Sequence, residues 1–394
     1  MQNSLVRVAL PLARMFRALQ SRVRGLSEMA RRSKAPKVPA TGTAAANVAR
    51  FSTRATPLPP IALALQGGGA HGAFTWGVLD RLLAEPGLRL VAASGASAGA
   101  LNAAVLASGL VEGGPDAARA KLSALWHRVS ALARLIPRRP DPFEHVAPSW
   151  NAEWAFPNSA LDLLMRFASP YQFNPLGLNP LRDVLVDLVD FERLRGRKAL
   201  RLLIAATNVE TSAGRIFANE ELSPDVLLAS ACLPTLNQAV KLGDGYYWDG
   251  GFTANPPILP LVELGLADDL VLVRVNPTRE EGVPTDPQAI RTRLSRIAFE
   301  SPLKRELEIV ERLGAMSGES DAPDALGRRL RRLRLHTVAD DATMARLDQS
   351  SRLQPDAALM RHLAEAGRAA AGRWLEAFRT EVAMRPAARL ERAG

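Results

Sequence analysis

Residues 63–74 read LALQGGGAHGAF, an apolar run followed by closely spaced glycines. The apolar run begins slightly earlier, so residues 61–66 have the pattern of a buried strand, and residues 73–85 place apolar side chains at helical spacing. A second strand is predicted over 88–94 and a second helix over 98–109. This order is typical of an α/β fold in which helices cover the faces of a parallel sheet.

The glycine loop can be interpreted in two ways. Gly67, Gly69 and Gly72 have the G-x-G-x-x-G spacing of a dinucleotide-binding loop, between a predicted strand and a predicted helix. That motif also needs an acid at the end of the next strand, and the next strand here runs into VAASGASAG, which has none. We therefore favour the second interpretation, in which bare backbone N–H groups face a reacting oxygen.

Residues 95–99, GASAG, support that interpretation. They form a G-x-S-x-G pattern between a predicted strand and a predicted helix, which is the context of a nucleophile elbow. Gly95 and Gly99 keep the tight turn free of bulk, and the helix that begins behind Ser97 favours developing negative charge. A turn of small residues that only allows close helix packing is the alternative.

If Ser97 is a nucleophile, the glycine loop is expected to be its oxyanion hole. Backbone N–H groups there would stabilise the charge that acyl transfer builds on the carbonyl oxygen, and losing one donor typically costs about 10²–10³-fold in rate. The predicted oxyanion-hole residues are Gly67, Gly68, Gly69, Ala70 and Gly72.

A serine nucleophile needs a base, and the sequence GDGYYWDGGFTANPPI over 243–258 offers two aspartates. Asp249 precedes Gly250 and Gly251, which let another part of the backbone approach its carboxylate. Asp244 has a similar setting and is the main rival. The alternative for Asp249 is a turn aspartate that caps its own backbone.

These motifs together resemble the patatin-like phospholipase family. The family's glycine-rich loop corresponds to QGGGAHG, its serine motif to GASAG and its aspartate motif to DGG, all in the family's order. LASACLP at 228–234 resembles the segment between the serine and the aspartate, and the resemblance covers residues 58–275. NPLGLNPLRD and RIAFESPLKREL resemble a bacterial subgroup with a C-terminal helical extension.

The resemblance implies a three-layer α/β fold with a central, mostly parallel sheet flanked by helices. It also implies hydrolysis of lipid carboxylic esters by a Ser–Asp dyad without histidine, with Ser97 as nucleophile and Asp249 as base. An aspartate at its ordinary pKa is a poor base at neutral pH, so we expect burial to raise the pKa of Asp249 and a direct bond to Ser97.

His71 departs from the family, which usually has Arg or Lys at this position. Histidine is a weaker fixed charge at pH 7, so the preference for a phospholipid head group is in doubt. We retain His71 as a candidate substrate contact near the oxyanion or a phosphate group. The alternative is a structural hydrogen-bonding residue.

Two other functions stay open. The chain order Ser97, Asp249, His336 is compatible with a Ser-His-Asp esterase, although a basic helical stretch precedes His336. A non-catalytic membrane-binding module that kept the fold is the second alternative, and the intact motifs argue against it.

Basic charge is concentrated at the N-terminus. The net charge is +10, and residues 1–55 hold eleven Lys/Arg and one acid, so the remainder is neutral and we expect no nucleic-acid partner. Residues 1–32 interleave arginines with apolar side chains at helical spacing. This predicts a basic amphipathic helix for peripheral contact with an anionic membrane, and a mobile or core-docked helix is the alternative.

Cysteine and histidine usage suggest where the protein works. Cys232 is the single cysteine, which fits a reducing compartment, and the N-terminus does not resemble a secretory signal. We therefore expect a cytoplasmic protein, peripheral at the inner membrane surface. The five histidines are scattered, and we expect no metal and no cofactor.

The predicted organisation has three regions. Residues 1–57 are the arm and a linker, and residues 58–275 are the patatin-like hydrolase domain, with further strands over 199–209 and 269–277. Residues 112–180 have an irregular pattern, which we interpret as a cap-like insertion. Residues 276–394 are predicted to form a mainly helical C-terminal extension.

Overall fold

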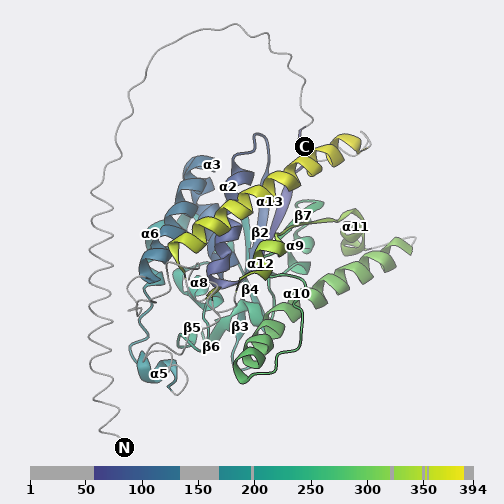
Figure 1. Ribbon diagram of the computed structural model, residues 1–394. Helices are drawn as coiled ribbons and strands as arrows, with labels where there is room; N and C mark the ends of the chain where they lie inside the picture. The colour runs from purple at the N-terminus through teal and green to yellow at the C-terminus, as the bar shows by residue number, and fades with distance from the viewer. Residues whose placement is uncertain are drawn as a thin grey trace, which may run out of the picture. The chain divides into compact units, whose positions relative to one another are not determined.

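The computed structural model describes residues 57–133, 168–196, 199–319, 324–347, 351–352 and 355–385 (Figure 1). The predicted N-terminal helix over 1–32 lies outside these residues, as does the part of the predicted cap over 134–167.

Within the described ranges, eight strands form one mixed sheet. Its parallel part comprises β1 (Ile61–Leu65), β2 (Leu90–Gly95), β3 (Arg201–Asn208), β7 (Asp269–Val273) and β8 (Arg334–Val338). Its antiparallel part comprises β4 (Gly214–Ala218), β5 (Val240–Leu242) and β6 (Gly245–Asp249). The strand order is β5-β6-β3-β2-β1-β7-β8, with β4 also paired to β3. The predicted, mostly parallel sheet is confirmed.

Alternate residues of the central strands belong to two separate cores. Ile61, Leu63 and Leu65 of β1 point into one apolar cluster, whereas Ala62 and Ala64 point into the other. Both faces of the strand are therefore buried, which explains its continuous apolar run. A sheet with a core on each face gives the three layers that the family resemblance implied.

Helices from distant parts of the chain cover these faces (Figure 1). One core contains side chains of α2 (Gly72–Leu83), α3 (Ala98–Ala133) and α13 (Ala357–Met384). The other contains side chains of α9 (Leu259–Leu264), α10 (Pro287–Glu319) and α11 (Ala325–Arg332). The shorter helical elements are η1 (Gly69–His71), α5 (Pro170–Phe173), α6 (Leu181–Leu188), α7 (Phe191–Leu194), η3 (Asn219–Glu221), α8 (Pro224–Ser230), η4 (Gly250–Phe252) and α12 (Asp341–Ala345).

The helix predicted over 98–109 is longer than expected. It ends only where Gly113 and Gly114 leave helical geometry, and a second helical half runs from Pro115 to Ala133. The irregular pattern predicted for 112–180 is therefore wrong for residues 115–133, where Leu122, Leu125 and Trp126 are buried. The physical reason is that Pro115 stands in the first turn of a helix, where its missing N–H costs nothing.

The C-terminal region is mostly helical, and it also completes the central sheet. Strand β8 pairs in parallel with β7, and α13 crosses α2 at very short range. A Cβ added to Gly77 would lie 1.9 Å from the carbonyl oxygen of Ala364, and one added to Gly367 would lie 2.1 Å from that of Phe74. In the described part of the chain, no helix has the length and apolar character needed to span a membrane.

Candidate active site

Ser97 stands at a sharp turn between β2 and α3. Its φ of 53° is in the left-handed region, which a residue with a side chain adopts only at a cost. The turn depends on Gly99, because a Cβ there would lie 2.0 Å from the carbonyl oxygen of Leu65. Ser97 is 8% exposed, so the elbow places its hydroxyl at the edge of the sheet with little access for water.

Asp249 ends β6 and is completely buried. Its Oδ1 accepts the N–H of Gly251 at 2.8 Å, so one oxygen does cap the local turn, as the alternative interpretation proposed. Its Oδ2 has no hydrogen-bond partner of normal geometry among the described residues. The two oxygens therefore differ, and only Oδ2 is free to accept a proton.

The environment of Asp249 favours the protonated carboxyl. Burial raises its pKa to about 7, while the Gly251 N–H and the nearby Ser97 hydroxyl act in the opposite direction. In the described part of the chain no arginine or lysine pairs with this carboxylate. A carboxyl that titrates near neutral pH can take up and release a proton under ordinary conditions.

One short segment holds both residues in place. The N–H of Ser97 donates to the carbonyl oxygen of Ser230 at 3.1 Å, and its distance to Ser230 Oγ is 3.2 Å. The N–H of Asp249 donates to the carbonyl oxygen of Cys232 at 2.9 Å. The end of α8 thus bridges serine and aspartate, a role that its sequence alone did not reveal.

The glycine loop contains fewer free donors than predicted. The N–H of Gly67 donates to Asn255 Oδ1 at 2.7 Å, and the N–H of Gly72 donates to carbonyls of the preceding turn. These two residues are therefore not available as oxyanion donors. For the N–H groups of Gly68, Gly69 and Ala70, no acceptor lies among the described residues.

Ala98 adds a donor that the sequence analysis overlooked. It is the first residue of α3, so its N–H has no partner within the helix. Its position directly after the serine was the available signal, because that N–H commonly belongs to an oxyanion hole.

Asn255 connects the glycine loop to the loop that follows Asp249. Its Oδ1 holds Gly67, and its Nδ2 donates to the carbonyl oxygen of Phe299 on α10 at 3.1 Å. The ring of Phe299 in turn packs against Gly251, where an added Cβ would lie 2.5 Å away. The two loops and α10 are thereby fixed relative to one another.

His71 lies in the loop but is 3% exposed. Its Nε2 is 2.7 Å from Ser351 Oγ. Burial, together with the charge of Arg352, lowers its pKa to about 3, so the ring is neutral. The structure therefore places the candidate substrate contact in a hydrogen bond with the C-terminal region.

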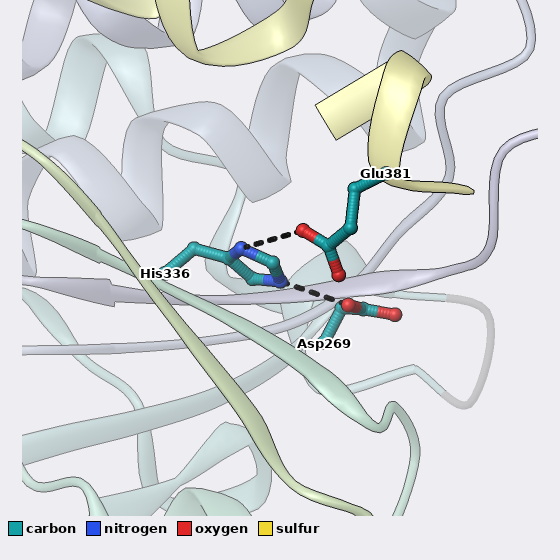
Figure 2. A group of neighbouring side chains, drawn as sticks. All are labelled: Asp269, His336 and Glu381. Carbon is teal, nitrogen blue, oxygen red and sulfur yellow. Dashed lines mark hydrogen bonds and ion pairs between the residues drawn. The ribbon is translucent and has the colours of Figure 1, made fainter. Parts of the chain in front are cut away.

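The rival residues are not brought to Ser97. Asp244 is exposed in the turn between β5 and β6. His336 lies on β8, three strands from β2 in the sheet order, which is roughly 14 Å at about 4.8 Å per strand. Its Nε2 is instead 2.8 Å from Asp269 Oδ1 (Figure 2).

Asp269, His336 and Glu381 form a cluster whose ligand atoms lie close enough to surround a metal ion (Figure 2). Two arginines argue against that role. Arg334 Nη2 and Arg385 Nη2 each lie 2.7 Å from a carboxylate oxygen of Asp269. They occupy its lone pairs and repel a cation, so the cluster is better understood as an ion-pair network.

Comparison with known proteins identifies a family for this chain. The patatin-like phospholipase family matches residues 63–262, slightly more than half of the chain, and the match includes the glycine loop, Ser97 and Asp249. Among solved structures, VipD from Legionella pneumophila is similar with a TM-score of 0.36 and 14% identity, covering 82% of this chain and 67% of its own. No curated protein matches the chain.

Proposed function

Because this chain belongs to the patatin-like phospholipase family, we propose that it hydrolyses lipid carboxylic esters as a phospholipase A or lipase-like esterase. The family supports lipid acyl hydrolase activity in general terms. The observation that carries the finer proposal is the buried Asp249, whose unpartnered Oδ2 faces no cation and whose pKa is close to neutral.

In the first step Ser97 Oγ attacks the ester carbonyl carbon, and its proton moves to Asp249. The carbonyl oxygen becomes negatively charged, and N–H groups of the glycine loop and of Ala98 donate to it. When the ester C–O bond breaks, Asp249 returns the proton to the departing alcohol. The acyl group is then bound covalently to Ser97.

In the second step water attacks the acyl-enzyme and gives a proton to Asp249. The bond to Ser97 Oγ breaks, Asp249 returns the proton to this oxygen, and the carboxylic acid leaves. A positioned base typically contributes about 10²–10⁴-fold in rate, and each oxyanion donor about 10²–10³-fold.

The proposal is tested with a series of soluble p-nitrophenyl esters and a fluorophosphonate probe. We expect wild type to turn over the esters and to be labelled covalently, and Ser97→Ala to lose both. Ser212→Ala is the matched control, because Ser212 also has a positive φ, of 58°, but lies in an exposed turn. A folded wild type that is neither active nor labelled would support the non-catalytic membrane-binding module instead.

The N-terminal arm over 1–32 is proposed to hold the enzyme at an anionic membrane, in the cytoplasm. Support comes from its basic, amphipathic sequence. Deleting residues 1–55 should lower binding to anionic liposomes and leave turnover of soluble esters unchanged. Equal liposome binding by the truncated protein would rule the role out.

A further inference from the structure

Asn276 and Arg352 lie together on the other side of the glycine loop from Ser97. The strand order β2-β1-β7 places Ser97, the glycine loop and Asn276 after three neighbouring strands. Arg352 joins from the C-terminal region, and a Cβ added to Gly69 would lie 2.3 Å from its carbonyl oxygen. The main chain of Arg352 therefore rests directly on the loop.

The two side chains are connected to each other and to the sheet. Arg352 Nη2 donates to Asn276 Oδ1 at 2.7 Å. The N–H groups of Val275 and Asn276 donate to Gln66 Oε1 at 2.9 and 3.2 Å, which fixes the backbone of Asn276 beside the start of the glycine loop. Asn276 is 2% exposed, so this arrangement is part of the interior.

Two buried donors of this pair have no acceptor. Arg352 Nε and Asn276 Nδ2 are both without a hydrogen-bond partner in the part of the chain that the structure describes. The hydrogen-bond partner of the Arg352 guanidinium is a neutral amide, and no described carboxylate forms an ion pair with it. A guanidinium whose Nε is shielded from water is normally paired with a negative group, and no described residue provides one here.

Arg296, on neighbouring α10, shows the usual arrangement. It is buried, whereas Arg352 is half-buried, and it pairs with Glu280 and with Glu300, whose Oε1 lies 2.5 Å from its Nε. These two glutamates influence Arg352 at longer range but are held by Arg296. The contrast between the two arginines shows that no described residue supplies Arg352 with a negative partner.

We propose that Arg352 and Asn276 bind a phosphate-class anion carried by the substrate, which would make the enzyme selective for phosphate-bearing lipids. This inference rests on the proposed function. A guanidinium and an amide N–H are well suited to phosphate oxygens. The site is about two strand spacings, or roughly 10 Å, from the strand that leads to Ser97, and a glycerophospholipid carries its phosphate a few bonds from its ester carbonyls.

The neutral His71 strengthens the assignment. It cannot supply a fixed charge to the glycine loop, because its ring is uncharged and is bonded to Ser351. Arg352 is the neighbouring residue that can. It lies outside the residues matched by the family, so this site is a feature of the C-terminal region of this chain.

The test compares a phospholipid with a diacylglycerol of the same acyl chains, both in micelles of the same neutral detergent. Arg352→Gln should lower kcat/KM for the phospholipid by roughly 10- to 100-fold, the worth of a charged hydrogen bond, and spare the diacylglycerol. Arg346→Gln, which removes an exposed charge from the same region, should change neither. An equal loss on both substrates would overturn the proposal, because Arg352 would then only support the loop.

Binding of inorganic phosphate gives a readout that does not depend on activity. Phosphate should raise the Tm of wild type and not that of Arg352→Gln, and it should inhibit phospholipid hydrolysis competitively. If wild type hydrolyses neither lipid yet phosphate still raises only its Tm, the proposed function fails and the anion site stands. An equal response of wild type and variant would overturn the site.

A second variant, Asn276→Asp, tests the proposal even if Arg352→Gln does not fold. It places a carboxylate of the same shape beside the guanidinium and so fills the site from within. We expect Tm to rise in buffer without phosphate and the phosphate response to disappear. A phosphate response as large as in wild type would contradict the proposal.

Discussion

Two aspartates in the same sheet, Asp249 and Asp269, are both fully buried, yet their environments are opposite. Burial raises the pKa of both carboxyls. At Asp249 only a backbone N–H and the Ser97 hydroxyl oppose this effect, and the pKa stays at about 7. At Asp269, hydrogen bonds from Arg334, His336 and Arg385 outweigh burial and hold the pKa well below its usual range.

The comparison shows that burial alone does not indicate function. A buried carboxylate surrounded by arginines is permanently ionised and holds distant segments together, here β7, β8 and the end of α13 (Figure 2). A buried carboxylate without a cation keeps a proton that it can exchange. The partners, rather than the depth, distinguish the proposed base from the structural ion pair.

The largest expected effect comes from Asp249→Asn. Removing the base should lower kcat for a soluble ester by roughly 10²–10⁴-fold, because Ser97 then has no proton acceptor. The unfolding free energy, measured in urea at pH 8, should not fall, because no ion pair is lost. If the variant keeps most of its activity, the base lies elsewhere and Asp244 is the next candidate.

Asp269→Asn should have the opposite profile. We expect a loss of about 3 kcal/mol in unfolding free energy, at the low end for a broken buried pair because its arginines are partly exposed. Ester turnover by the folded protein should be unchanged. The control is Asp268→Asn, where an exposed pair with Arg332 is worth less than about 1 kcal/mol. Equal losses at the two positions would remove the distinction between the aspartates.

The two carboxyl groups should also make the free energy of unfolding depend on pH in opposite directions. Folded Asp249 binds its proton up to about pH 7, whereas the unfolded group releases it near 3.8, so its contribution to stability is lost as pH rises between these values. The contribution of Asp269 is lost as pH falls below 3.8. Asp249→Asn should therefore gain stability relative to wild type between pH 5 and 8, as urea titrations would show.

Activity should follow the same titration in the free enzyme. The kcat/KM of wild type should rise with pH through about 7, as Asp249 becomes ionised and able to accept a proton. A profile that is flat from pH 5.5 to 8.5 would mean that Asp249 does not titrate in this range.

The smallest effects are expected at the rival residues. Asp244→Asn and His336→Gln should leave ester turnover within roughly twofold of wild type, as substitutions away from the reacting groups do. His336→Gln should lower Tm, because it removes a partner of Asp269. Loss of turnover in a folded His336 variant would restore the Ser-His-Asp alternative.

The parts of the site that sequence could predict are local. The strand, glycine loop and helix of residues 61–83, and the elbow at Ser97, depend on neighbours in sequence, so their patterns were readable. The hydrogen-bond partners of the individual backbone N–H groups in the glycine loop could not be predicted. The N–H of Gly67 is taken by Asn255, 188 residues away, and no local pattern records such a bond.

The same limit applies to the fold. The parallel sheet followed from alternating strands and helices, but the pairing of β8 with β7 depends on contacts between distant segments. Gly109 was expected to end a helix, whereas it allows the two halves of α3 to approach: a Cβ there would lie 2.3 Å from Ala118 Cα. A glycine that serves packing and one that ends a helix look alike in sequence.

The close crossing of α2 and α13 has a consequence for biosynthesis. Helix α2 is translated well before α13, and at about 5–20 residues per second the roughly 270 residues between them take on the order of 15–55 s. Throughout that interval the surface of α2 around Phe74 and Val78 lacks its permanent cover. We expect the nascent chain to depend on chaperones until α13 leaves the ribosome, and chains that stop before residue 357 to be degraded or to aggregate.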